Sequence, residues 1–451
     1  MKRGLTVNDM LKELMRKTID RALSVYHVDE VECYHTNIQS SKFSLKKRDL
    51  EDRSFSQTRG LGLRIIKDKK LGYSHGTDFT EKGIDELIQN TLNNHHYQEK
   101  EYDLSFYKEK SSYAENNIET DFNQIAFEEK FNLALSLEEK VRSGHSAITC
   151  VESTSYFEAV SESFLYNSHD YQASKYHSVA SLGAMALSKE GEQEESGGAG
   201  LTVKNYHNFD LDYIAKEAIF DATKLLGAKK ISSYKGMVLL SRDMAKIILS
   251  LLSSSFKGST VYKKKSLFPT IGEEVAPRFF SLVDNPLLKE GLGHYGVDDE
   301  GTHAQKTYLV ENGIVKQHLY DRYYAHLMNM QSTGNGTRGT YMSTPSISYS
   351  NYYLEKGDHS FQDLLTLMNK GIYVTDILGA HTANTITGEF SFGISGIVVE
   401  DGKLSYPFRG ATLSGNLKQV LQNIVGLGDD LDLRETTGAP SVLIDQLSVA
   451  G

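Results

Sequence analysis

The sequence predicts an α+β protein built from two domains. Its 451 residues exceed the size at which a single hydrophobic core usually stops growing. Hydrophobic residues make up 39% of the chain and charged residues 24%, a balance typical of a soluble globular protein. Segments with helical spacing alternate with β-rich blocks and turn signals. We place the boundary near residue 230, between an N-terminal α+β domain (1–230) and a β-rich C-terminal domain with a few helices (231–451).

The N-terminal half begins with a predicted helix, in which Leu11, Leu14 and Thr18 recur at helical spacing. Two residues, Asp68-Lys69, mark the turn of a predicted hairpin. In chain order, the elements expected in this half are a helix over 7–26, a β-rich block over 30–76, helices over 80–94 and 122–143, strands over 147–187, a mobile acidic loop over 190–198, a helix over 211–226 ending at Gly227, and a linker over 229–236.

In the C-terminal half, a short apolar strand is predicted over 237–240, and Ser241 caps the helix that follows. Turn dipeptides at Asn312-Gly313 and Asp401-Gly402 predict two hairpins. The apolar face of the helix after Ser241 is expected to comprise Met244, Ile247, Ile248, Leu251 and Leu252. The remaining elements expected are a helix over 361–370, a late helix capped by Asn416 or Ser414 and reaching residue 425, and a closing strand over 442–449.

Composition argues against several classes of function. The net charge of −10 argues against general nucleic-acid binding, which needs a basic surface. No apolar run reaches the roughly 18–20 residues that a membrane span requires, so we expect no membrane partner. No apolar segment of a secretory signal follows the N-terminus. Cys33 and Cys150 are the two cysteines, which give no disulfide framework and indicate a reducing cytoplasm.

A search for catalytic motifs finds none complete within this chain. The 15 histidines offer no pair separated by three, four or five residues, so the usual helical zinc motif is missing. A metal site assembled from distant elements stays open as an alternative. No GxSxG elbow occurs. Gly291, Gly293 and Gly296 match the dinucleotide fingerprint by letter, but the acidic residues after them cannot open the required helix. We therefore expect no hydrolase activity from this chain alone.

Glycine-rich polar loops and an acidic turn in the second half are the remaining candidates for a binding site. Glycines allow tight turns and a close approach of backbone to a ligand. Ordinary turn chemistry would leave the same pattern, so the residues alone do not decide between the two interpretations. The candidate substrate or interface residues are Asp298, Asp299, Glu300, Thr333, Gly334, Asn335, Gly336, His381, Asn384 and Glu389.

These loops belong to five segments whose order and spacing form a recognisable pattern, namely residues 297–302, 309–313, 332–336, 387–391 and 410–417. In them the sequence resembles the TldD/PmbA family, which is also labelled modulator of DNA gyrase. The resemblance covers about residues 235–451. A looser match in the first half rests on residues 59–64, 71–73 and 165–168.

The resemblance implies an N-terminal α+β domain, a β-rich C-terminal domain, and a cytoplasmic dimer linked to the breakdown of peptides and unfolded chains. In the TldD branch, the helix after the first C-terminal strand carries His-Glu-x-x-x-His, and a late Cys completes a zinc site. The corresponding helix here, over 241–256, contains Arg242, Asp243, Lys246 and Ser250 instead, and no Cys follows Cys150. No catalytic residue and no metal ligand can be carried over. The chain is similar to the PmbA (TldE) branch, so zinc is expected only in a TldD-type partner.

The leading hypothesis is a non-zinc (TldE/PmbA-like) subunit of a TldD/TldE-type metalloprotease. It would shape the chamber for a peptide or unfolded-protein substrate, with the loops at 331–343 and 381–393 at the chamber or the subunit interface. The alternative is a non-enzymatic homodimer that binds peptides or a regulator. A third hypothesis keeps catalysis through a metal held by scattered His and Asp residues. Specific peptide binding without an effect on proteolysis would favour the second, and stoichiometric zinc the third.

Overall fold

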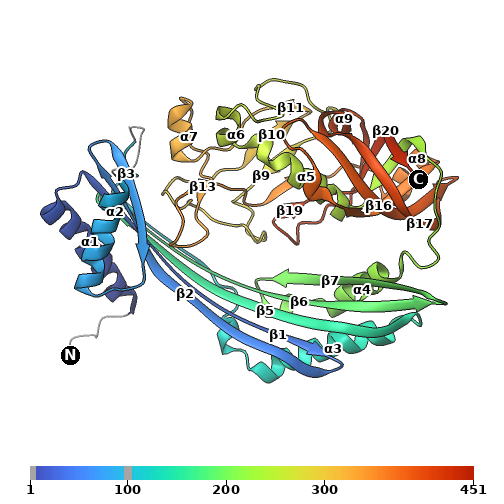
Figure 1. Ribbon diagram of the computed structural model, residues 1–451, viewed down its shortest axis with the longest axis horizontal. Helices are drawn as coiled ribbons and strands as arrows, with labels where there is room; N and C mark the ends of the chain where they lie inside the picture. Colours follow the sequence, from blue (N-terminus) through green and yellow to red (C-terminus); the bar gives the residue numbers. More distant parts are fainter. Residues whose placement is uncertain (1–6, 96–103) are drawn as a thin grey trace.

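A long curved sheet forms the N-terminal half of the protein (Figure 1). The computed structural model describes residues 7–95 and 104–451. Within that part of the chain, the strand order is β3-β2-β1-β5-β6-β4, and β7 pairs with β6 beyond the end of β4. The strands are β1 (Glu30–Lys46), β2 (Asp49–Lys67), β3 (Lys70–Gly76), β4 (Ser112–Asn117), β5 (Ile148–Asn167), β6 (Gln172–Glu190) and β7 (Gln193–Val203).

Two pairs of helices cover this sheet at opposite ends (Figure 1). At one end, α1 (Val7–Tyr26) and α2 (Glu81–His95) bury apolar side chains against β1 and β2. At the other end, α3 (Phe127–Ser143) and α4 (Leu211–Thr223) pack on β5, β6 and β7. Each pair presents one apolar face, so the sheet has two separate cores. None of the described helices is long and apolar enough to cross a membrane.

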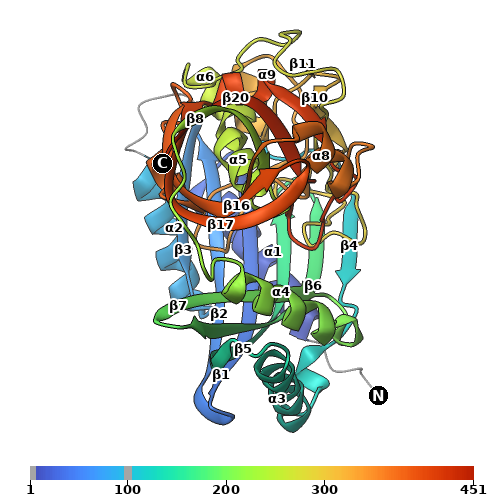
Figure 2. The same cartoon turned by 90° about the vertical axis from the view of Figure 1, so that its right-hand side faces the viewer.

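The C-terminal half is built on a sheet that closes on itself. Its order is β17-β16-β15-β8-β20-β18, and an additional pairing of β17 with β20 closes the ring. Figure 2 looks along this ring, with α5 (Arg242–Ser253) framed by the strands. The strands are β8 (Tyr234–Leu240), β15 (Gly371–Leu378), β16 (Glu389–Glu400), β17 (Lys403–Asn416), β18 (Ile424–Leu427) and β20 (Val442–Ala450).

Shorter elements complete this half and share its main core with α5 and the closed sheet. The short strands are β9 (Leu282–Asp284), β10 (Thr307–Glu311), β11 (Ile314–Val315), β12 (Gly336–Thr337), β13 (Ser346–Ile347), β14 (Tyr352–Leu354) and β19 (Thr437–Gly438). The further helices are α6 (Gly258–Tyr262), α7 (Arg322–Leu327), α8 (Phe361–Met368) and α9 (Leu417–Gln422).

The α+β class is confirmed, and the predicted helix over 7–26 and all three hairpin turns are present. The expected mobile loop over 190–198 is wrong. That segment forms the β6–β7 hairpin, whose turn occupies only Gly191 and Glu192. The glycines serve packing, because a Cβ on Gly197 would lie 2.3 Å from the backbone nitrogen of Ala222 in α4. The acidic, glycine-rich segment is therefore part of strand β7, against which helix α4 packs closely.

The predicted apolar face of α5 is also partly wrong. The structure buries Ala245, Ile248, Leu249 and Leu252, whereas Ile247 is only half-buried. The buried stripe is therefore rotated by about one residue, and Met244 and Leu251 lie at its border, partly buried against the same core. Among the other boundaries, α3 begins at Phe127 after a short 3-10 turn over Phe122–Gln124, and α9 ends at Gln422.

Candidate functional site

A cleft of about 520 Å³ lies between the two halves of the chain. Strand β7 and helix α4 form one wall, and the start of α5 with the end of β15 forms the other. A loop over 429–436, between β18 and β19, completes it through Asp432, Arg434 and Glu435. The cleft is therefore made of segments that are far apart in the sequence, as is usual for a ligand site between domains.

Lys246 carries a buried positive charge into the cleft from α5. Its side chain is 8% exposed, and its Nζ lies 3.1 Å from Asp243, 3.6 Å from Asp432 and 3.3 Å from Glu435. Burial alone would lower the pKa of Lys246, but the three carboxylates outweigh it and raise that pKa. The ammonium is therefore a fixed charge of the site at neutral pH.

Asp432 holds this part of the cleft together. It accepts hydrogen bonds from Arg434 at 2.9 Å and 3.1 Å, and the Arg434 guanidinium lies 3.6 Å from the centre of the Tyr213 ring in α4. Burial raises the pKa of Asp432, but the Arg434 hydrogen bonds and the Lys246 charge lower it to about 2. Asp432 is therefore ionised near neutral pH and pairs with both Lys246 and Arg434. It does not act as a proton donor there.

A second lysine joins the opposite walls of the cleft. The Nζ of Lys224 in α4 lies 2.5 Å from Asp221 and 2.9 Å from Asp376 at the end of β15, and it donates to the Thr375 carbonyl at 3.2 Å. Burial lowers the pKa of Lys224, whereas Asp221 and Asp376 raise it more. The two lysines of the cleft are thus buried beneath carboxylates, and exposed acidic side chains such as Asp243 and Glu435 contribute much of its outer surface.

The acidic turn at 298–300 lies elsewhere, buried where the closed-sheet domain meets β1, β2 and β6. Asp298 accepts the backbone N–H groups of Glu300, Thr302 and Gly336 at 2.8–2.9 Å. Burial, followed by repulsion from Glu300, raises the pKa of Asp298 well above its usual range. The Asp298 side chain therefore shapes the loop around it and does not face solvent.

The neighbouring carboxylates pair with cations from the N-terminal sheet. Asp299 contacts Lys175 of β6, and the Arg338 backbone N–H donates to it at 2.8 Å. Arg64 of β2 lies 3.1 Å from Glu32 and 3.8 Å from Glu300, and Arg338 also contacts Glu32. Three cations thus face three carboxylates inside the protein, and the two halves are fastened together by this network.

The loop at 333–336 belongs to the same junction. Thr333 donates to Asn335 at 2.7 Å, and Asn335 donates to the buried Asp284 at 2.7 Å. Gly334 has a φ of 73°, and an added Cβ would lie 2.5 Å from the His303 carbonyl oxygen. A Cβ on Gly336 would meet the Glu300 carboxylate at 2.3 Å. The predicted glycines therefore allow other segments of the same chain to pack closely against this loop.

The last three predicted residues are also exposed: His381 and Asn384 lie in the connection from β15 to β16, and Glu389 begins β16. Asn384 accepts the backbone N–H groups of Ile386 and Thr387 and so stabilises a turn. The structure does not bring these residues together with the acidic turn. None of the ten predicted residues is among those lining the cleft, and their role in substrate or partner binding stays a prediction.

Three domain models of the PmbA/TldA metallopeptidase family match this sequence in order. Domain 1 matches residues 31–94, the central domain residues 120–226, and the C-terminal domain residues 233–451. The chain belongs to the PmbA/TldD family. The family models place the cleft between the central and C-terminal domains, because β7 and α4 belong to the former and α5 to the latter.

Relatives from bacteria and archaea match most of the chain. Metalloprotease PmbA of Escherichia coli is 23% identical over 97% of each chain. A PmbA homologue of Buchnera aphidicola is 31% identical, over 55% of this chain and 56% of its own. A crystal structure from Thermotoga maritima, described as a putative modulator of DNA gyrase, has a TM-score of 0.88 and 25% identity, covering 98% of this chain and 100% of that one. TldE of Thermococcus kodakarensis shares the fold, with a TM-score of 0.84 and 20% identity over 98% and 100% of the chains.

Because the PmbA/TldD family is named as metallopeptidases, the cleft must be tested for a metal site. Zinc takes three or four N, O or S ligands that converge at about 2.0–2.3 Å. Here the Lys246 ammonium lies among the three nearest carboxylates and would repel a cation. In the described part of the chain, no group of three or more His, Cys, Asp or Glu side chains is placed to hold a metal ion. The residues of this cleft therefore do not fit zinc.

Sequence reasoning missed the charged groups of this cleft. It singled out the helix over 241–256 for its lack of zinc ligands, yet Lys246 three residues after Asp243 looks like an ordinary surface pair on a helix. Lys224, Asp376 and Asp432 come from three other elements, and no spacing along the chain connects them. Helix α5 was the one signal that pointed to the right place.

Proposed function

We propose that this chain is the non-zinc, TldE/PmbA-like subunit of a TldD/TldE-type metalloprotease that acts on peptides or unfolded proteins. Membership of the PmbA/TldD family and relatives named as metalloproteases support the class of activity. The carrying observation is the Lys246 ammonium, which lies among carboxylates on the helix that would bear the zinc motif of the TldD branch. A zinc-bearing partner would supply the activated water, and this chain would hold and orient the substrate.

The outer edge of β7 supports a role in holding an extended peptide. The N–H of Gly198 donates to Asp221 at 2.8 Å and therefore points away from β6. Because backbone direction alternates along a strand, Gly200 and Thr202 also turn their N–H and C=O groups outward, into the cleft they line. A strand added at this edge would be bound through main-chain groups and would tolerate many side-chain sequences.

The exposed carboxylates of the cleft would help to bind the peptide and would not take part in cleaving a bond. Asp243 and Glu435 are more than half exposed, at 69% and 66%, while the lysine between them is buried. These carboxylates would attract the amine end or basic side chains of a bound chain. No proton transfer is assigned to them, because the reacting water would belong to the partner subunit.

The first test is to purify this chain together with a TldD-type subunit and to follow cleavage of an unfolded polypeptide. We expect clearly faster cleavage by the pair than by the zinc subunit alone. Equal activity of the zinc subunit alone would contradict the proposal. Binding of peptides without any effect on cleavage would favour the non-enzymatic homodimer instead, and stoichiometric zinc in the purified chain would overturn the proposal.

A matched pair of variants tests the edge of β7. Thr202→Pro removes one outward N–H, a change that an edge strand tolerates. Thr202→Ala keeps the N–H and loses only the hydroxyl contact with Ser181, as the proline variant also does. We expect Thr202→Pro to weaken peptide binding and cleavage in the complex and Thr202→Ala to leave both near the wild-type level. Equal behaviour of the two variants would remove β7 from the binding surface.

A further inference from the structure

One face of α4 forms a wall of the cleft and carries an unpaired carboxylate. Tyr213, Glu217, Phe220 and Asp221 line the cleft and recur at helical spacing, so their side chains lie on the same face of the helix. In the described part of the chain, the Glu217 carboxylate forms no hydrogen bond and no ion pair, whereas Asp221 pairs with Lys224. Glu217 is therefore the carboxylate of this wall that is available to a ligand.

The neighbouring turn of α4 shows how a cation is held at this wall. The Arg434 guanidinium lies 3.6 Å from the centre of the Tyr213 ring and donates to Asp432. An aromatic face and a carboxylate both attract a guanidinium, so the two together suit an arginine side chain. Glu217 and Phe220 present the same two groups one turn further along α4, and the Phe220 side chain is 45% exposed. This second ring and carboxylate hold no cation from residues 7–95 or 104–451.

The outer edge of β7 borders this face of α4. Helix α4 packs on the side of β7 that bears Ala199 and Leu201, with which it shares a core. Asp221 accepts the outward N–H of Gly198 at 2.8 Å, so the cleft-lining face of α4 reaches the edge itself. In a strand paired with that edge, the residues opposite Ala199 and Leu201 would point to the same side. Every second side chain of a bound peptide would therefore be directed toward α4.

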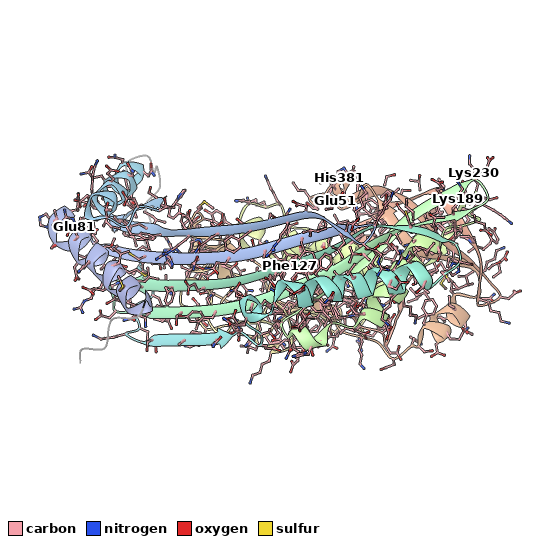
Figure 3. All side chains as sticks on the ribbon, turned by 90° about the horizontal axis from the view of Figure 1, so that it is seen from below. Glu51, Glu81, Phe127, Lys189, Lys230 and His381 are labelled. Atoms are coloured by element: carbon pink, nitrogen blue, oxygen red, sulfur yellow. The ribbon has the colours of Figure 1, made fainter. Side chains whose placement is uncertain are left out.

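The walls of the cleft are held in place by contacts between the central and C-terminal domains. Figure 3 shows Lys189 of β6 and Lys230 of the connection between these domains at the same end of the molecule. Arg409 of β17 pairs with Glu195 of β7. The buried lysine that joins α4 to the end of β15 adds a second fastening. The wall of α4 therefore faces the edge of β7 in a preorganised arrangement.

We propose that Glu217 and Phe220 form a subsite for a basic side chain of an extended peptide bound at the edge of β7. This inference rests on the peptide-holding role proposed above and adds a substrate class, polypeptides that place an arginine or lysine opposite α4. Arginine is preferred to lysine, because its planar guanidinium stacks on a ring and forms two hydrogen bonds with a carboxylate. Arg242 on the facing wall has no ion pair within the described residues. It competes with a ligand's cation for Glu217.

Fluorescence anisotropy of the full-length chain with two labelled, end-capped peptides tests the subsite. Both peptides alternate serine and valine around one central residue, which is arginine in one and citrulline, its uncharged isostere, in the other. We expect the arginine peptide to bind about three- to thirtyfold more tightly. Glu217→Gln should remove this preference, and Glu217→Lys should transfer it to a peptide with a central glutamate. Asp212→Asn is the matched control, at an 87% exposed carboxylate of α4 outside the cleft, and should leave the preference unchanged.

Two further variants separate the ring from the charges. Phe220→Leu keeps apolar bulk without the ring and should reduce the preference, whereas Arg242→Gln should strengthen binding of the arginine peptide; weaker binding there would overturn the subsite. So would equal affinity of the wild-type chain for both peptides, binding of neither, or a preference that survives Glu217→Gln. The protease proposal is judged separately by the cleavage assay with the zinc subunit. A clear preference without faster cleavage would support the subsite and contradict the proposed function.

Discussion

Lys175 of β6 ties the N-terminal sheet to the acidic turn of the C-terminal domain, and Lys175→Met would leave Asp299 without that cation. Both side chains are nearly buried, at 9% and 6% exposure, so water cannot replace the ammonium. Breaking such a buried pair costs about 3–5 kcal/mol. Asp299 keeps the Arg338 backbone N–H at 2.8 Å, so we expect the lower end, about 3 kcal/mol, or roughly a hundredfold in the folding equilibrium.

Urea unfolding followed by tyrosine fluorescence measures this loss, since the chain has 26 tyrosines and no tryptophan. Lys110→Met is the matched control, because its pair with Asp170 is exposed, at 78% and 55%, and should not shift the midpoint. Lys175→Met/Asp299→Asn should recover most of the loss, because no unpaired charge then stays buried. Equal midpoints for the two single lysine variants would refute the reasoning.

Two further predictions concern pH and packing. Burial, and then the charge of Glu300, raise the pKa of Asp321 from 3.8 to about 7, so the stability from this group is full below its unfolded pKa and is lost as the pH rises through about 7. Asp321→Asn keeps the helix-capping oxygen and should flatten this decline, as urea midpoints between about pH 5 and 8 would show. A decline of unchanged slope would contradict the assignment. In β7, Gly197→Ala should cost about 1–3 kcal/mol, because its Cβ would lie 2.3 Å from the Ala222 nitrogen. Gly200→Ala meets nothing closer than 3.3 Å and should cost less in thermal melts; equal losses would rule out the steric explanation.

Local sequence patterns predicted much of the fold. Helical spacing predicted α1, and the dipeptides Asn312-Gly313 and Asp401-Gly402 predicted two hairpins, because these features depend on residues close together in the sequence. Strand β7 was missed for the opposite reason. Its acidic residues and glycines read as a loop, and only the approach of α4 to Gly197 explains why glycine is needed there.

The candidate site depended on contacts that no local pattern records. The acidic turn beginning at Asp298 was singled out as a candidate for substrate or interface contact, but a run of carboxylates looks the same in the sequence whether it is exposed or buried. Its partners Lys175 and Arg64 lie in a different domain and supply the charges that let the turn be buried. The loop at 333–336 was noticed for its glycines, and the structure shows that they admit other parts of the same chain.

The sequence by itself determined the class of the fold, most of its helices and hairpins, and the family pattern, including the absence of zinc ligands from α5. These are properties of neighbouring residues and of ordered motifs. The tertiary structure decided that the acidic turn is buried between the two halves of the chain and that Lys246 lies among three carboxylates in a cleft. Such features arise where distant segments meet, because burial and pairing of a charge depend on every element packed around it.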